Sequence, residues 1–146
     1  MVDEPPGDEN LGQLMLQAFW WLDRRAAYEL ERGGEPALPA AQALTLARIA
    51  AVGSRPADLA RLLGVSRQAV HQTLNELERE GLVRRVRTPG TPVTVQTTAA
   101  GRRRARAVTS ADAAAEQALA DRLGVDRLVE LRRTLEADWG EPEDAV

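Results

Sequence analysis

Apolar positions recur at helical spacing between Ser66 and Gly81. On a helix turning about 100° per residue, Val70, Leu74 and Leu77 fall within about 60° of one another. Three amide side chains and an arginine fall almost opposite this apolar stripe. The stretch therefore predicts a helix with one face that packs and one face that can form hydrogen bonds.

The polar face of this predicted helix is unusually rich in amides. It holds Gln68, Gln72, Asn75 and Arg79, and His71, the only histidine of the chain, lies beside them. The polar face of an amphipathic helix is merely solvated in most proteins. The elements around the helix therefore decide what this face contacts.

A shorter helix is predicted just before it, over "PADLARLL". Pro56 stands in the first turn, where a missing N–H costs nothing, and Gly64 can supply the turn that ends the helix. Ser66 can then cap the next helix after a connection of about three residues. Two helices joined so closely must cross steeply, as in a helix-turn-helix.

The apolar period changes after Gly81. "LVRRVR" and "PVTVQT" are short β-branched runs on either side of "TPGT", which predicts a hairpin around a Pro-Gly turn. Val93 and Val95 are expected to point to one side of it, and Thr94 and Gln96 to the other. A hairpin after a helix-turn-helix is a wing.

Long helices are predicted on both sides of this unit. Asn10 can cap "LGQLMLQAFWWLDRRAAYELE", and "LPAAQALTLARIAAV" predicts a helix ending at Gly53. Thr98 can cap "AAGRRRARAVTSADAAAEQALADRL", and a last helix is expected from about Asp126 to Trp139. The two terminal helices carry apolar stripes that one chain cannot bury, which predicts a homodimer. We assign dimerisation to Leu11, Leu14, Met15, Ala18, Trp21, Leu22, Leu128, Leu131 and Leu135.

The charge is distributed unevenly, although the chain as a whole is only slightly acidic, at −3. Residues 54–106 hold 11 arginines against four acidic residues, a net charge of +7, whereas the remainder holds 8 arginines against 18 acidic residues, a net of −10. A basic middle between acidic ends is typical of a chain in which one part faces phosphates.

Several classes of function are excluded by composition. The 146 residues suit one domain with a core of its own, and without cysteine and with a single histidine a disulfide, a thiol nucleophile or a zinc site is not expected. A Ser/His/Asp set or a Gly-rich phosphate loop is not evident either, so we predict neither an enzyme nor a cofactor or metal site. The acidic N-terminus lacks the features of a secretion signal, and we expect a cytoplasmic protein.

The order of these elements, with "SRPADLARLLGVSRQAVHQTLNELEREGLVRR", the hairpin and "TTAAGRRR", resembles the MarR family of bacterial transcriptional regulators. The resemblance covers most of the chain and is most specific from Leu38 to Arg104. It implies a homodimeric winged helix-turn-helix protein that dimerises through its N- and C-terminal helices. Such proteins usually repress genes, and many release DNA when a small aromatic or phenolic ligand binds.

Two positions depart from the family pattern. Family wings usually carry an Asp-x-Arg segment whose arginine enters the minor groove, whereas the tip here is "TPGT". Arg85 or Arg87 on the first strand either replaces that arginine or touches only phosphate. Thr73 stands where the family usually has an aliphatic residue on the packing side of the helix.

A recognition helix fits the major groove with its N-terminal half against base edges, where amides pair with adenine and arginine with guanine. We therefore assign base readout to Gln68, His71, Gln72 and Asn75. His71 is as readily interpreted as solvated or as a phosphate contact. Contacts to the DNA backbone are assigned to Ser54, Arg55, Ser66, Arg67, Arg79, Arg84, Arg85 and Arg87.

Two further features have alternative interpretations. The run "GRRRAR" opens a helix, where positive charge is unfavourable, so its arginines contact either DNA phosphates or acidic residues of the wing base or dimer helices. Phe19 and Trp20 are candidates for a ligand pocket. Trp20 and Trp21 point about 100° apart, so that at least one of them is expected to pack the dimer core.

The sequence thus predicts a mainly α fold with a small β-wing, a winged helix-turn-helix with N- and C-terminal dimerisation helices. The expected parts are a disordered acidic N-terminus (1–9), a dimerisation helix (10–35), a DNA-binding region (36–100), C-terminal dimerisation helices (101–140) and an acidic tail (141–146). The expected function is sequence-specific binding of double-stranded DNA at a palindromic operator, with repression and release by a small aromatic ligand. The alternative is a winged helix that serves as a protein–protein adaptor.

Overall fold

The computed structural model describes residues 7–52 and 55–142. Its elements are α1 (Leu11–Arg32), α2 (Ala40–Val52), α3 (Pro56–Leu63), α4 (Arg67–Arg79), β1 (Val83–Val86), β2 (Thr94–Thr97), α5 (Ala99–Leu123) and α6 (Val125–Glu136). The predicted helix end at Gly53, the contact assigned to Ser54, and most of the two predicted acidic tails lie outside the described residues.

The helix-turn-helix has the geometry that its sequence predicts. Gly64 ends α3 in the left-handed conformation, at φ 64°, and its N–H donates to the carbonyls of Ala60 and Arg61. The Ser66 hydroxyl oxygen accepts from the backbone N–H of Ala69 at 3.1 Å and so caps α4. The short connection and both caps are therefore confirmed.

A compact core joins α2, α3, α4 and the hairpin. Leu59 of α3, Val70, Leu74 and Leu77 of α4, and Val95 of β2 are each at most 1% exposed. The apolar stripe predicted for α4 is thus its packing face, and Thr73 lies half-buried at the edge of that face. Packing on this side fixes which side of α4 faces outward.

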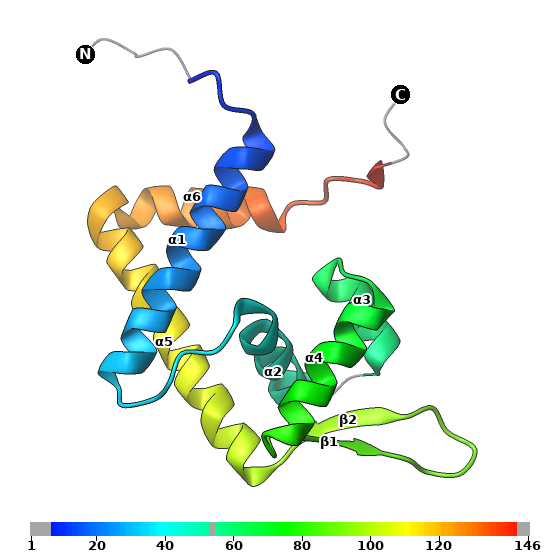
Figure 1. The fold of residues 1–146 in the computed structure, drawn as a ribbon. Coiled ribbons are helices and arrows are strands. Elements are labelled where there is room, and N and C mark those ends of the chain that lie inside the picture. Colours follow the sequence, from blue (N-terminus) through cyan, green and yellow to red (C-terminus); the bar gives the residue numbers. More distant parts are fainter. Residues whose placement is uncertain (1–6, 53–54, 143–146) are drawn as a thin grey trace.

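The antiparallel hairpin is anchored to α4 and α5. Val83 pairs with Thr97 and Val86 with Thr94, and the loop between the strands extends away from the helices (Figure 1). Val95 is buried and Gln96 exposed, as the alternation predicts, whereas Val93 lies before β2 and is half-buried.

Gly101 is required where α5 starts beneath the hairpin. A Cβ on this residue would lie 1.8 Å from the carbonyl oxygen of Leu82, so no side chain fits. Thr98 strengthens the same junction, because its hydroxyl donates to the Gly81 carbonyl at 2.6 Å and accepts from the Gly101 N–H at 3.0 Å. The predicted Thr98 cap is confirmed, and it also ties the wing to α5.

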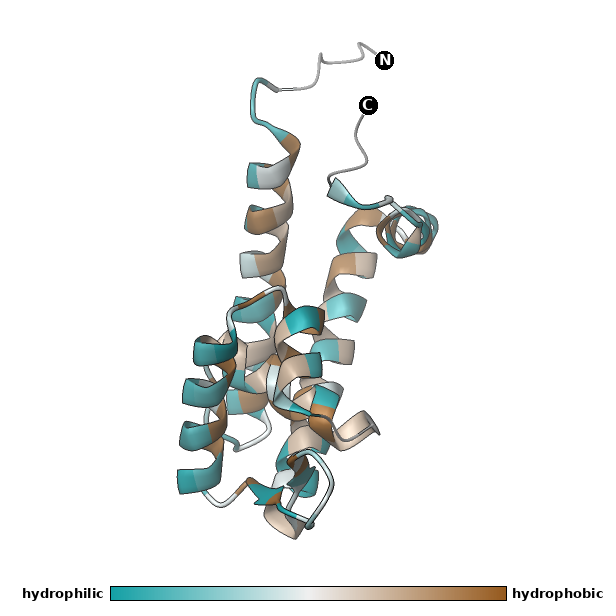
Figure 2. Ribbon diagram, turned by 90° about the vertical axis from the view of Figure 1, so that its right-hand side faces the viewer, coloured by the Kyte–Doolittle hydropathy of each residue, from teal (hydrophilic) through white to brown (hydrophobic). Residues whose placement is uncertain are grey.

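Helix α5 connects the winged unit to the opposite end of the molecule, where α6 and the start of α1 lie (Figure 1). A second core forms where α1 crosses α5, around Ala26, Leu30, Val108, Ala111 and Ala115. The first turns of α1 project beyond this crossing (Figure 2).

Two helix boundaries differ from the sequence prediction. Helix α2 begins at Ala40 rather than Leu38, because a residue that precedes a proline disfavours the helical conformation. Helix α6 ends at Glu136 rather than Trp139, since the backbone becomes extended at Ala137. The Trp139 indole N–H instead folds back and donates to the Thr134 carbonyl at 2.9 Å.

Candidate nucleic-acid interface

The amide face of α4 is open to solvent. Gln68, His71, Gln72 and Asn75 are all exposed, on the side of the helix opposite its buried stripe. The structure thus brings the four predicted base-reading residues onto one accessible face. The Ser66 cap and the buried apolar stripe of α4 fix the orientation of this face.

Arg85 links the wing to this helix. Its Nη2 donates to Oδ1 of Asn75 at 2.9 Å, and its Nη1 forms an ion pair with Glu78. The Arg85 side chain is only 15% exposed. Its guanidinium is therefore occupied within the chain, and it fixes the orientation of Asn75.

The other predicted backbone contacts lie around α4 and along the wing. Four of these side chains are exposed, those of Arg55, Arg67, Arg79 and Arg87. Arg84 is exposed as well, and its Nη2 donates to Oε1 of Gln96 on the paired strand at 3.4 Å. These arginines flank the amide face and could reach phosphates on either side of a groove. The Ser66 hydroxyl oxygen accepts the hydrogen bond that caps α4. Its O–H group can still donate to a phosphate.

The arginine run at the start of α5 divides between inward and outward side chains. Arg104 forms an ion pair with Glu35 at 3.0 Å and donates to the Pro36 carbonyl. Its partner Glu35 lies in the loop just after α1, at the end of the segment 10–35 that the sequence assigns to dimerisation, and not at the wing base. Arg102 donates to the Thr97 carbonyl at 3.3 Å, whereas Arg103 and Arg106 are exposed.

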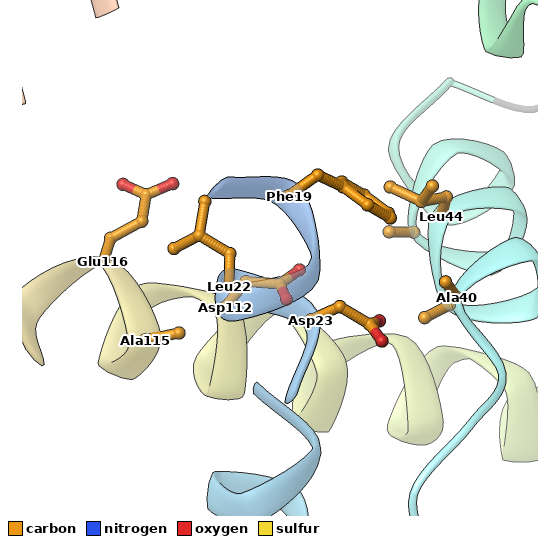
Figure 3. A pocket seen from close by; sticks show the side chains of 10 residues that line it. Phe19, Leu22, Asp23, Ala40, Leu44, Asp112, Ala115 and Glu116 are labelled. Carbon is orange, nitrogen blue, oxygen red and sulfur yellow. The ribbon is translucent and has the colours of Figure 1, made fainter. Parts of the chain in front are cut away.

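A hollow of about 220 Å³ lies between α1, α2 and α5. Its walls are mostly apolar, and Phe19 and Leu44 line its α1 and α2 sides (Figure 3). Phe19, one of the two candidates for a ligand pocket, thus lines this hollow. Trp20 is not among the residues that line the hollow, but its ring packs edge-on against Phe19, with the ring centroids 5.2 Å apart.

Carboxylates supply most of the polar lining of this hollow. They belong to Asp23 on α1 and to Asp112 and Glu116 on α5 (Figure 3). Partial burial raises the pKa of Asp112 above its ordinary value, and the nearby charges of Glu116 and Asp23 raise it further. Glu116 is paired with Arg132 of α6.

The residues assigned to dimerisation remain largely uncovered in the single chain. Six of these residues are exposed, namely Leu11, Leu14, Met15, Ala18, Leu131 and Leu135. The other three are half-buried, namely Trp21, Leu22 and Leu128. The arginine Arg122 lies over the Trp21 ring, 6.0 Å from its centroid. Sequence reasoning did not single out the further exposed apolar side chains of Leu16, Val125, Val129 and Trp139.

Two contacts of the site had no sequence signal. One is the Arg85–Asn75 hydrogen bond, and the other joins Gln42 of α2 to Glu76 of α4 at 2.9 Å. Gln42 is 7% exposed, and its Oε1 has no hydrogen-bond partner within the described part of the chain. These contacts depend on how the helices pack, which local pattern does not reveal.

Membrane-spanning helices are not found among residues 7–52 and 55–142, since no helix there is both long and apolar enough. The same residues contain no cluster of three or more side chains suited to hold a metal ion.

Comparisons with known proteins agree on one family. The MarR family profile matches residues 38–91, from just before α2 to the tip of the wing. No curated protein matches the chain significantly.

Solved structures match over almost the whole chain. A mutant MarR from E. coli complexed with operator DNA is 26% identical, with a TM-score of 0.69 over 86% of this chain and 90% of that one. The Mycobacterium tuberculosis MarR family protein Rv2887 is 27% identical in complex with DNA, with a TM-score of 0.64 over 88% of this chain and 97% of that one. The structure of Rv2887 in complex with salicylic acid is likewise 27% identical in sequence, with a TM-score of 0.67 over 88% of this chain and 96% of that one.

The profile match covers the winged helix-turn-helix, and the structural matches add the helices on either side of it. The fold is the one predicted from the sequence, mainly helical with a two-stranded wing. Residues 38–91 of the chain thus match the MarR family profile, and most of the chain is similar in structure to MarR-family winged helix-turn-helix proteins that were solved in complex with DNA.

Proposed function

We propose that this protein is a homodimeric repressor that inserts two copies of α4 into successive major grooves of a palindromic operator. The observation that carries the proposal is the exposed amide face of α4, held rigid from behind by a fully buried stripe. Amide side chains arranged on an outward helix face match the hydrogen-bonding edges of adenine. This function requires the protein to act in the cytoplasm, where the chromosome lies.

The base-reading residues are Gln68, His71, Gln72 and Asn75. Phosphate contacts come from Ser54, Arg55, Ser66, Arg67, Arg79, Arg84 and Arg87. Arg85 acts indirectly, because it holds Asn75 and the wing in place. Its engagement with α4 supports a positioning role more than a direct contact with the minor groove.

The dimer forms between the N- and C-terminal helices of two chains. Leu11 is 68% exposed and Leu135 49% exposed, although both belong to the apolar faces of amphipathic helices. Two-fold pairing would cover such self-complementary surfaces. We accordingly divide the chain into dimerisation segments at 10–35 and 101–140 and a DNA-binding region at 36–100.

The hollow beside Phe19 serves as a site for a small aromatic ligand whose binding releases DNA. Its position supports this role, because α2 contributes one wall and also contacts α4 through Gln42 and Glu76. A ligand that binds better to one arrangement of α2 would shift the orientation of α4.

Selection of bound fragments from random duplex DNA tests the proposed function. We expect a roughly palindromic site with half-sites about 34 Å apart. The affinity for this site should fall steeply as salt rises, because each phosphate contact releases counterions. An adaptor protein would select no sequence and would show no salt-sensitive affinity for duplex DNA.

A further inference from the structure

The charge around the hollow between α1, α2 and α5 indicates which ligands it accepts. Carboxylates come from two helices, Asp23 on α1 and Asp112 and Glu116 on α5, and no arginine lies among the described residues that line it. The chain carries 19 arginines in all, so a lining free of positive charge does not reflect a lack of basic residues.

Two of these carboxylates lack a cation within the chain. Glu116 is paired with Arg132, but among the described residues no basic side chain forms an ion pair with Asp23 or Asp112. Asp112 is partly desolvated and also faces the negative charges of Asp23 and Glu116, and its raised pKa reflects this unfavourable environment. A positive charge placed here would relieve the repulsion.

The rest of the lining suits an apolar body. Phe19 and Leu22 come from α1, and Ala43, Leu44 and Ala47 from α2. The Phe19 ring can contact both an aromatic group and a cation. The small alanine side chains leave room between the helices.

We propose that this hollow binds small aromatic cations, such as protonated arylalkylamines, with the ammonium group beside Asp23 and Asp112 and the ring between Phe19 and the α2 wall. An aromatic carboxylate of the same shape would meet two unpaired negative charges and be rejected. This proposal names the class of ligand for the site proposed above. It rests on the proposed function only for the effect of the bound ligand on DNA binding.

Three probes of one shape test the proposal: 2-naphthylmethylamine, 2-naphthalenemethanol and 2-naphthoate. Calorimetric titration of the free protein at neutral pH should show the amine binding about fivefold or more tightly than the alcohol, and the carboxylate more weakly than both. Asp23→Asn and Asp112→Asn should each reduce the preference for the amine over the alcohol. Asp121→Asn, an equal loss of charge elsewhere on α5, should leave it unchanged.

A second variant locates the site. Ala47→Leu adds volume to the α2 wall but leaves the charge of the lining unchanged. It should weaken the binding of both the amine and the alcohol. The proposal is overturned if the carboxylate binds as tightly as the amine, if no probe binds, or if the Asp23→Asn and Asp112→Asn variants keep the full preference of the unmodified protein for the amine over the alcohol.

DNA binding is measured separately by fluorescence anisotropy without ligand. A protein that binds its selected operator but rejects the amine contradicts the ligand class alone. A protein that binds the amine but selects no operator contradicts the proposed function instead.

Discussion

The Nη2 of Arg85 in the wing lies 2.9 Å from Oδ1 of Asn75 on α4. The same guanidinium forms an ion pair with Glu78, one turn further along α4. A residue of the wing thus holds an amide of the recognition helix in one orientation. Wing and helix are therefore expected to act as a single recognition unit.

Because of this contact, Arg85→Ala and Asn75→Ala should relax the preference for the same base pair. A good base contact contributes about 1–3 kcal/mol of discrimination. Binding measurements on operators mutated at that base pair should show non-additive effects in the double variant, with a coupling of about 0.5 kcal/mol or more. Arg84→Ala is the control and should weaken binding evenly across sequences. Additive losses from Arg85 and Asn75 would contradict the positioning role.

Gly101→Ala should destabilise the protein although it replaces a helical glycine with a better helix former. Such a change usually stabilises a helix by about 1 kcal/mol. Here the new Cβ would lie 1.8 Å from the Leu82 carbonyl oxygen and would force the wing away from α5. Thermal unfolding should show a midpoint lower by several degrees, about 4 °C or more. Gly12→Ala near the start of α1 should not lower it comparably.

Asp112→Asn should raise stability at neutral pH. The pKa of Asp112 is raised in the folded protein, so this carboxyl favours folding when it is protonated and loses that contribution as pH rises through the raised value. The gain from asparagine should therefore be largest at neutral pH and shrink as pH falls toward 3.8, the ordinary value. Thermal unfolding across this range provides the measurement, with Asp121→Asn as the charge-matched control. A gain that grows on acidification would contradict the direction of the shift.

Leu131→Asp should weaken the dimer. Leu131 lies on α6 in an apolar groove with Leu22, Leu128 and Leu135, and a carboxylate there would be buried on association. Sedimentation equilibrium should show a monomer at concentrations where the unmodified chain is dimeric. Operator affinity should fall about a hundredfold, since the two half-sites would no longer be bound together. Leu62→Asp on α3 is the control, and a dimer that persists in Leu131→Asp would refute the assignment.

The sequence predicted those elements whose boundaries are set by local chemistry. Pro56, Gly64, Ser66 and Thr98 each mark a helix end through a cap or a backbone preference, and the structure places those ends where expected. The buried stripe of α4 followed from its spacing alone. Local rules were sufficient because these signals act within a few residues.

The remaining features arise from contacts between distant segments. Arg85 and Asn75 are 10 residues apart and meet only because the hairpin folds back against α4, and Gln42 and Glu76 are 34 apart. The carboxylates of Asp23 and Asp112 approach each other only because α1 crosses α5. Helical periodicity indicates which face packs, but it does not indicate which charges a neighbouring helix brings.

The most direct test of the account compares base preference in the unmodified protein and in the Gln68→Ala/Gln72→Ala double variant. Both chains are presented with the selected operator and with every single-base substitution of one half-site. The account predicts that the variant keeps its fold and its salt-sensitive affinity for DNA but loses discrimination at the positions nearest the start of α4, by about 1–3 kcal/mol for each lost contact. An unchanged pattern of preference in the double variant would contradict it.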